Sequence, residues 1–93
     1  MKTVNAMHVN ILDNCVTLAD HTGTGDMVCF LEGDTDRTII ARGSIPIWHK
    51  MAIRPVKKGG DICKYGNVIG IALDNIEAGD HVHVHNLRSC VIG

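Results

Sequence analysis

The sequence predicts a small all-β domain with long, bent hairpins and at most one or two short helices. Three observations favour this class: Val and Ile are frequent, Pro occurs at only 2 positions, and 10 glycines separate short apolar runs. A chain of 93 residues is long enough to build one hydrophobic core. We therefore expect a single domain over residues 1–93.

Strands are predicted where short apolar runs are bounded by Gly and Asp. The expected strands are Val4–Val9, Met27–Leu31, Thr38–Ala41, Met51–Val56, Ile62–Lys64, Val68–Leu73 and His81–Leu87. Residues 15–20 stay open between a strand and a helix. The Asp-Asn pair before them is able to cap a helix, whereas their Val-Thr pair is β-branched and resists one.

A short motif occurs three times before an expected strand. It is a Gly-Asp pair, found at Gly25-Asp26, Gly60-Asp61 and Gly79-Asp80. Gly permits a positive φ, and the Asp side chain is able to bond back to the turn backbone. Each pair therefore predicts a turn that leads into a strand.

Charge and hydropathy exclude several classes of protein. The net charge is -1 and the pI about 6.6, so the chain has no basic excess for binding nucleic acid. Its apolar runs are far shorter than a membrane span needs. The first ten residues lack the apolar core of a signal peptide, so we expect a cytoplasmic protein. A net charge near zero also favours a partner or, in its absence, a homo-oligomer.

The 4 cysteines are Cys15, Cys29, Cys63 and Cys90. Their wide spacing contains no C-x-x-C pair for zinc or redox chemistry. A two-disulfide scaffold is formally open, but a cytoplasmic chain favours reduced thiols packed as small apolar side chains.

The most informative motif is His81-Val82-His83-Val84-His85-Asn86. On a strand, the three imidazoles would share one face, and Val82 and Val84 would point into the core. The His face suits a metal, a carboxylate ligand or proton transfer near pH 7. A solvated strand whose polar face happens to be His is the alternative.

Three other groups of residues are candidate functional sites, and each also has an ordinary structural interpretation. Pro46-Ile47-Trp48-His49-Lys50 places a titratable base beside a cation, or is a solvated turn. Lys64-Tyr65-Gly66 offers a hydrogen-bonding ring, or a Tyr that covers the core at a strand end. Asp13-Asn14 suits a metal or hydroxyl groups, although a cap or Asx-turn is the more frequent use of such a pair.

Together these motifs resemble one family. The ordered set of Asp-Asn, His-Lys, Lys-Tyr-Gly and His-x-His-Asn is similar to the SAF-type small domain of the altronate and galactarate dehydratases. The small subunit of sulfolactate sulfo-lyase belongs to the same group. The resemblance implies a β-clip fold. It also shows a departure, because the family often has His where this chain has Asn10, and the nearest imidazole is His8.

The resemblance implies a carbon–oxygen lyase module that caps or completes the active site of a large dehydratase subunit and is inactive alone. Its implied catalytic residues are His49, His83 and His85. Its implied substrate-binding residues are Asp13, Asn14, Lys50, Lys64, Tyr65 and Asn86. A small sugar acid is the implied substrate, and a divalent metal is expected mainly in the large subunit. The alternatives are a sulfolactate sulfo-lyase subunit and a non-enzymatic module that binds a sugar acid or another anion.

Overall fold

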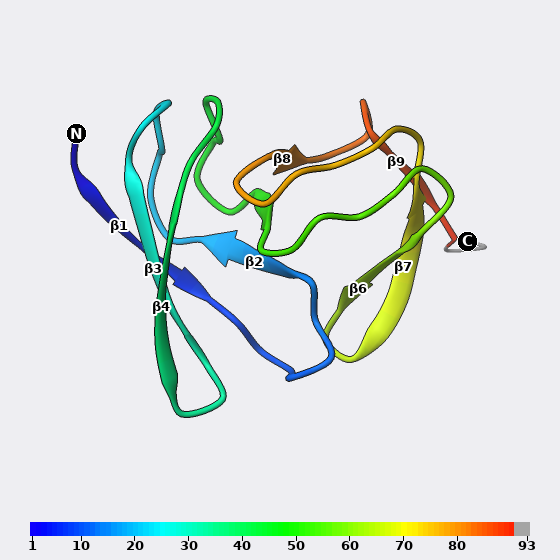
Figure 1. The fold of residues 1–93 in the computed structure, drawn as a ribbon, viewed down its shortest axis with the longest axis horizontal. Coiled ribbons are helices and arrows are strands. Elements are labelled where there is room, and N and C mark those ends of the chain that lie inside the picture. The colour runs from blue at the N-terminus through cyan, green and yellow to red at the C-terminus, as the bar shows by residue number, and fades with distance from the viewer. Residues whose placement is uncertain (91–93) are drawn as a thin grey trace.

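The structure is a computed structural model and describes residues 1–90. These residues form nine strands and no helix, which confirms the all-β prediction (Figure 1). The strands are β1 (Thr3–Met7), β2 (Cys15–Leu18), β3 (Met27–Glu32), β4 (Thr35–Ile40), β5 (Lys50–Ala52), β6 (Asp61–Lys64), β7 (Asn67–Ala72), β8 (His81–Val82) and β9 (Leu87–Ser89). Within this range there is also no helix long and apolar enough to cross a lipid bilayer.

The strands belong to two sheets. The larger has the order β4-β3-β1-β2-β5-β8, and the smaller has the order β6-β7-β9. All pairs are antiparallel except β1 with β3, which is parallel. Figure 1 shows the long hairpins β3–β4 and β6–β7 at opposite ends of the molecule, with β2 between them.

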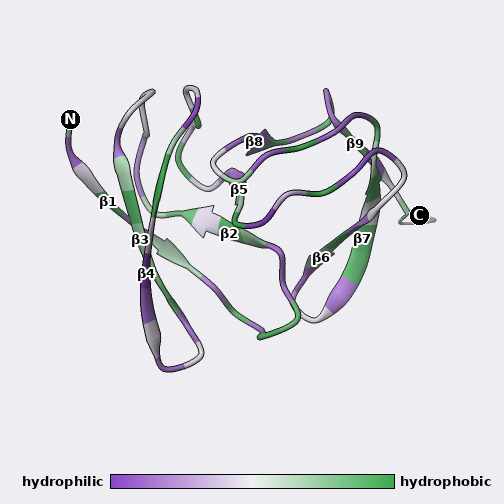
Figure 2. Cartoon of the chain, viewed as in Figure 1, coloured by the Kyte–Doolittle hydropathy of each residue, from purple (hydrophilic) through white to green (hydrophobic). Residues whose placement is uncertain are grey.

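The core consists of two hydrophobic clusters. One cluster gathers residues of β1 to β5 around Val16, Leu18 and Met51. The other lies between Cys15, Ile62 and Val82 and includes residues from both sheets. Hydrophobic residues are concentrated along β3 and β7 in Figure 2. Because burial of apolar area is the main stabilising contribution, the two clusters hold the sheets together.

Most of the expected strands are present within a few residues of their predicted ends. Residues 15–18 form β2, so the β-branched pair decides that open segment in favour of a strand. The predicted strand Met51–Val56 is shorter than expected, because β5 ends at Ala52 and the chain then turns toward Val56.

The prediction of one strand over His81–Leu87 is wrong. Only His81 and Val82 lie in β8, and Val84 is 74 % exposed instead of in the core. The chain turns because the carbonyl of His83 accepts hydrogen bonds from the N–H groups of both Asn86 and Leu87. The Asn86 side chain competes with strand pairing in the same way, since its Oδ1 accepts the N–H of His83.

One turn geometry occurs four times, at residues 22–26, 45–49, 56–60 and 76–80. Each copy begins with a buried residue that forms an isolated β-bridge to another copy, Thr22 with Ile45 and Val56 with Ile76. The fourth residue of each copy has left-handed backbone: Gly25, Trp48, Gly59 and Gly79. Three copies lie at the predicted Gly-Asp turns, and the copy at 45–49 was not predicted.

Backbone hydrogen bonds alone close every copy. The fifth residue donates its N–H to the carbonyl three residues earlier: Asp26 to Gly23, His49 to Pro46, Gly60 to Lys57 and Asp80 to Glu77. Each copy also exchanges two backbone bonds with one buried residue elsewhere: Ala41, Leu18, Ala72 and Ala52, in chain order of the turns. In two copies an Asp carboxylate adds a bond, Asp26 from the N–H of Gly23 and Asp80 from that of Glu77.

The copy at residues 45–49 departs from the others in two ways. Trp48 takes the left-handed position with a φ of 68°, a conformation that costs a residue with a Cβ about 1–2 kcal/mol. Pro46 stands where the N–H that binds the Asp carboxylate would be, and Pro has no N–H. An Asp at position 49 would therefore have no turn bond to make, and the side chain of His49 is left for other contacts.

Candidate functional site

Three imidazoles meet where this turn approaches β8. Nδ1 of His49 lies 2.8 Å from Nε2 of His81, and the His49 ring stacks on His83 with 4.5 Å between centroids. The rings of His81 and His83 are nearly parallel, with centroids 5.5 Å apart. One ring nitrogen from each residue lies within 4.8 Å of the other two. We call these three residues the histidine cluster.

Three different local structures position the cluster. The turn before β5 carries His49, the two-residue strand β8 carries His81, and the following bend carries His83. β8 is fixed against β5 through the pairs Lys50–Val82 and Met51–His81. The Asn86 side chain holds the bend, because Nδ2 donates to the carbonyl of His81 and Oδ1 accepts from the N–H of His83.

Two further predicted residues lie beside the cluster. The His85 ring is 5.2 Å from that of His81, and His85 is exposed. The charge of Lys50 acts on His83, so the ammonium group is within electrostatic reach of the cluster. Asn86 is itself buried with both ends of its amide bonded to backbone, so it positions the histidines.

Burial and the neighbouring charges favour the neutral forms of His81 and His83. Burial is the main cause that lowers the pKa of His81 to about 4, and the neighbouring imidazoles lower it further. Burial and then the charges of His49 and Lys50 also lower the pKa of His83. At neutral pH both rings therefore have lone pairs that can accept a proton or bind a metal.

A hollow of about 400 Å³ opens next to the cluster and has His81 in its wall. Its other lining residues are His21, Thr22, Ser44, Ile45 and Pro46. This volume is in the range of small-molecule sites. Another hollow of about 410 Å³, lined by residues of β1, β3 and β4, shares no residue with the histidine cluster.

Asp13 lies in a different place, at the turn between β6 and β7. Its carboxylate is fully buried and accepts hydrogen bonds from the N–H groups of Tyr65, at 3.0 Å, and Gly66, at 2.8 Å. Asn14 is bound to the same hairpin, with Nδ2 donating to the carbonyl of Asp61 and Oδ1 accepting the N–H of Cys63. The Asp-Asn pair thus attaches the hairpin β6–β7 to the segment that leads into β2, a long-range role that differs from the cap or Asx-turn considered from the sequence.

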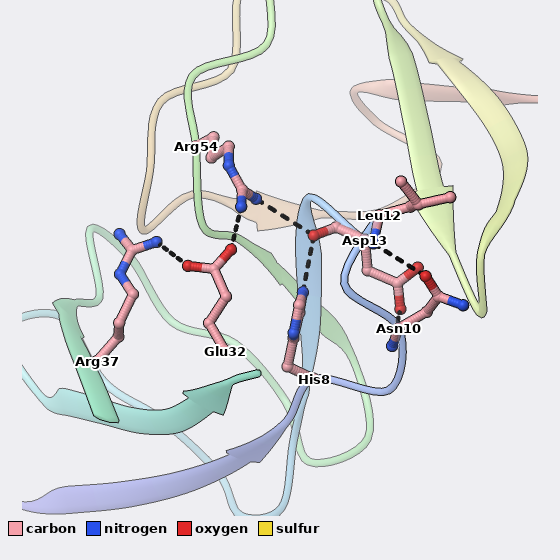
Figure 3. A network of polar contacts seen from close by, with 7 residues as sticks. All are labelled: His8, Asn10, Leu12, Asp13, Glu32, Arg37 and Arg54. Atoms are coloured by element: carbon pink, nitrogen blue, oxygen red, sulfur yellow. Dashed lines mark hydrogen bonds and ion pairs between the residues drawn. The ribbon is translucent and has the colours of Figure 1, made fainter. Parts of the chain in front are cut away.

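The backbone of Asp13 is also part of a polar network (Figure 3). Its carbonyl accepts hydrogen bonds from Nε2 of His8, at 2.8 Å, and from Nη1 of Arg54, at 3.3 Å. Arg54 also pairs with Glu32, whose other oxygen is 2.6 Å from Nη1 of Arg37. His8 therefore supports the Asp13 turn and lies outside the histidine cluster.

Lys64 and Tyr65 form a second unusual pair. Lys64 is 1 % exposed, and its Nζ has no hydrogen-bond partner among residues 1–90. That nitrogen lies 4.1 Å from the centroid of the Tyr65 ring, a cation–π contact. Tyr65 is 62 % exposed and has a left-handed backbone with a φ of 55°. Tyr65 is therefore accessible to a ligand, whereas Lys64 is buried.

The thiol of Cys15 is buried, and the charges of Lys64 and Lys50 act on it. Burial raises its pKa to about 12, although Lys64 and Lys50 act in the opposite direction. The thiol is therefore protonated at neutral pH, and its Sγ donates to the carbonyl of Cys63. The four cysteines are free thiols, as the sequence indicated.

The sequence analysis missed His21 and gave His81 no role in catalysis. The β-bridge between Thr22 and Ile45 brings His21 to the turn that carries His49, where Nδ1 of His21 accepts the N–H of Ile47. No local motif marks His21. A fourth copy of the turn at residues 45–49 would have predicted this contact. It was not recognised in the sequence because Trp48 occupies the position that Gly takes in the other copies.

Comparison with known proteins agrees with this architecture. The family described as the altronate/galactarate dehydratase SAF domain matches residues 4–90. The alpha subunit of (2R)-sulfolactate sulfo-lyase from Paracoccus pantotrophus is 38 % identical over 64 residues, which cover 68 % of this chain and 96 % of that subunit. Altronate dehydratase from Escherichia coli (strain K12) is 40 % identical over 82 residues, covering 87 % of this chain but 16 % of that enzyme.

A further alpha subunit of (2R)-sulfolactate sulfo-lyase, from Chromohalobacter salexigens, is 36 % identical over 76 residues, 80 % of this chain and 81 % of that subunit. The chain thus matches nearly all of a small subunit and a minor part of a large enzyme. The match over residues 4–90 includes β2 to β9 in full and all of β1 except Thr3. The chain belongs to the altronate/galactarate dehydratase SAF domain family.

Proposed function

We propose that the chain is the small subunit or module of a sugar-acid hydro-lyase, and that it brings the histidine cluster to an active site completed by a large chain. The observation that carries this proposal is the contact of His49, His81 and His83 next to a hollow with His81 in its wall. Imidazoles gathered beside such a hollow suit an elimination that needs a proton to be moved.

The reaction explains why these residue types are useful together. A base removes the proton beside the carboxylate, the C–H electrons form the C=C bond, and the hydroxyl on the next carbon leaves with the C–O electrons. An acid protonates the departing hydroxide to give water. A cation must hold the substrate carboxylate as negative charge develops. Lys50 fits that last role, since its charge acts on His83.

Among the imidazoles, His85 is the most free to move a proton. It is exposed and its ring contacts His81 from outside the tight group of three. His49 and His83 are the other candidates. Tyr65 offers an exposed hydroxyl to a substrate or to the large chain. Asp13, Asn14 and Asn86 act as positioning residues in this scheme, because backbone groups engage their side chains.

Two alternatives follow from the comparisons and the charge pattern. A carbon–sulfur lyase subunit is favoured by the match to 96 % of a sulfo-lyase alpha subunit. A non-enzymatic module that binds a sugar acid would use the same hollow without turnover. Without its partner, the chain is proposed to self-associate through exposed strand edges.

The test is reconstitution. The chain is co-expressed with the large dehydratase-type chain from the same genome, and the purified complex is assayed with altronate, galactarate and sulfolactate. We expect turnover by the complex and none by either chain alone. His85→Asn should lower kcat by about 10²-fold or more, while Lys58→Met, at an exposed site, should leave it unchanged.

Three results would contradict the proposal. They are turnover by the pure small chain in proportion to its concentration, full activity of a His83→Asn, His85→Asn double variant in the complex, and binding of a sugar acid with no turnover. The last result would favour the non-enzymatic module.

A further inference from the structure

We propose that the histidine cluster is a metal site of this chain, in which His49, His81 and His83 bind one divalent transition metal. The inference deepens the proposed function by placing a metal in the small chain, where the sequence led us to expect one mainly in the large subunit. It is argued from the geometry and chemistry of the cluster.

The ligand atoms are already gathered. One nitrogen from each ring lies within 4.8 Å of the others, and the closest pair is 2.8 Å apart. Two nitrogens bound tetrahedrally at 2.0–2.1 Å from a metal are separated by about 3.3 Å. Rotation of the rings about their side-chain bonds would bring the nitrogens toward the separation that one ion requires.

The surroundings hold the rings in place. The bend that carries His83 is fixed by both ends of the Asn86 amide, and β8 is fixed by its pairing with β5. Within residues 1–90, no carboxylate forms an ion pair with any of these imidazoles. A shared metal would give the gathered nitrogen lone pairs a common partner.

The donor set selects the class of metal. Three imidazoles without a carboxylate suit borderline ions such as Zn²⁺, Co²⁺ or Ni²⁺ and disfavour Mg²⁺ and Ca²⁺, which prefer oxygen. Three protein ligands leave a position open, the pattern of catalytic sites. His83 is exposed and His81 lines the hollow, so that position is accessible to a substrate oxygen. When one nitrogen of each ring in the histidine cluster binds the metal, His85 is the imidazole left for proton transfer.

The experiment uses the untagged chain after removal of metals with EDTA. Co²⁺ is titrated while its visible absorption is recorded, and calorimetry gives the stoichiometry. We expect one Co²⁺ per chain and the intense d–d bands of a tetrahedral site. His83→Gln, at an exposed position, should weaken binding by at least about tenfold.

Two further variants complete the test. His83→Cys keeps a ligand, so it should retain Co²⁺ and add a thiolate charge-transfer band. His85→Asn is the matched control, since it removes a neighbouring imidazole outside the group of three, and should bind Co²⁺ as the parent does. Circular dichroism checks that each variant is folded.

The inference is overturned if the parent chain binds no Co²⁺, or if His83→Gln and His85→Asn reduce binding equally. These measurements are independent of lyase activity. A chain that binds Co²⁺ in a complex without turnover would retain the metal site and refute the proposed function. An active complex whose small chain binds no metal would support the proposed function and refute the metal site.

Discussion

The carboxylate of Asp13 accepts the N–H of Gly66 at 2.8 Å across 53 positions of sequence. The Gly66 backbone is left-handed with a φ of 75°, and an added Cβ would lie 2.6 Å from the Asn10 side chain. Both features keep the hairpin β6–β7 close to the segment before β2. Asp13 is therefore a fixed point for the smaller sheet.

Asp13→Asn should destabilise the fold. An amide has one acceptor oxygen. Its NH₂ group would face a backbone N–H group that now donates a hydrogen bond to the carboxylate. We expect the free energy of unfolding in urea to fall by about 2 kcal/mol. Asp74→Asn, at an exposed position, is the control and should change it by less than about 0.5 kcal/mol. Equal effects of the two substitutions would refute the structural role of Asp13.

Trp48→Gly should stabilise the fold. Gly adopts the left-handed φ of 68° without the cost that a Cβ imposes, so the free energy of unfolding should rise by about 1 kcal/mol. Gly25→Ala is the reciprocal control. Its φ is 91° and nothing lies within 4 Å of the added Cβ, so its loss of stability measures the backbone cost alone. A destabilised Trp48→Gly would show that the indole is structural.

Lys64→Met should raise the stability of the fold and lower the activity of the complex. The substitution keeps an unbranched apolar chain and removes a buried amine that has no hydrogen-bond partner within residues 1–90. We expect the free energy of unfolding to rise by about 1 kcal/mol, and the activity of the reconstituted complex to fall. Lys58→Met, at an exposed site, is the control for both. A large loss of stability would show that the contact with Tyr65 outweighs the cost of burial.

Glu32 should make stability depend on pH in acid. The hydrogen bond from Arg37 is the main cause that lowers the pKa of Glu32, and the charge of Arg54 acts in the same direction. The folded protein therefore binds this proton less readily than the unfolded chain. The stabilisation is present above the ordinary pKa of 4.5 and is lost as pH falls through the lower folded value.

The measurement is thermal unfolding from pH 6 to pH 3. Glu32→Gln should unfold at a lower temperature than the parent at pH 6, and the two should converge in acid. A constant difference across this range would rule out a contribution from the carboxylate charge.

The sequence predicted the all-β class and most strands because alternation and Gly-Asp turns are local signals. The strand prediction failed after Val82, because the hydrogen bonds of Asn86 to His81 and His83 replace strand pairing there. A run of alternating His and Val does not predict that turn. The histidines were identified, but their contact with His49 depends on the pairing of β5 with β8. Such long-range pairing is absent from any short window of sequence.

Lys64 is another residue whose environment local sequence did not predict. The resemblance implied a substrate-binding role for Lys64, and alternation along β6 turns its side chain inward on the same face as Ile62. Asp13 and Asn14 were open between ligand and structural roles, and the contacts of their side chains with β6–β7 could not be read from the sequence.

The four turns differ in how much side-chain variation they allow. Their closing bonds all join backbone groups, yet an added Cβ at Gly79 would lie 2.4 Å from the carbonyl oxygen of Ile40, and one at Gly60 would lie 2.9 Å from that of Lys57. The copy at residues 45–49 differs most from the others, with Pro, Trp and His where a Gly-Asp turn would serve the fold. An engineer seeking a new specificity has the same loop as the first place to randomise.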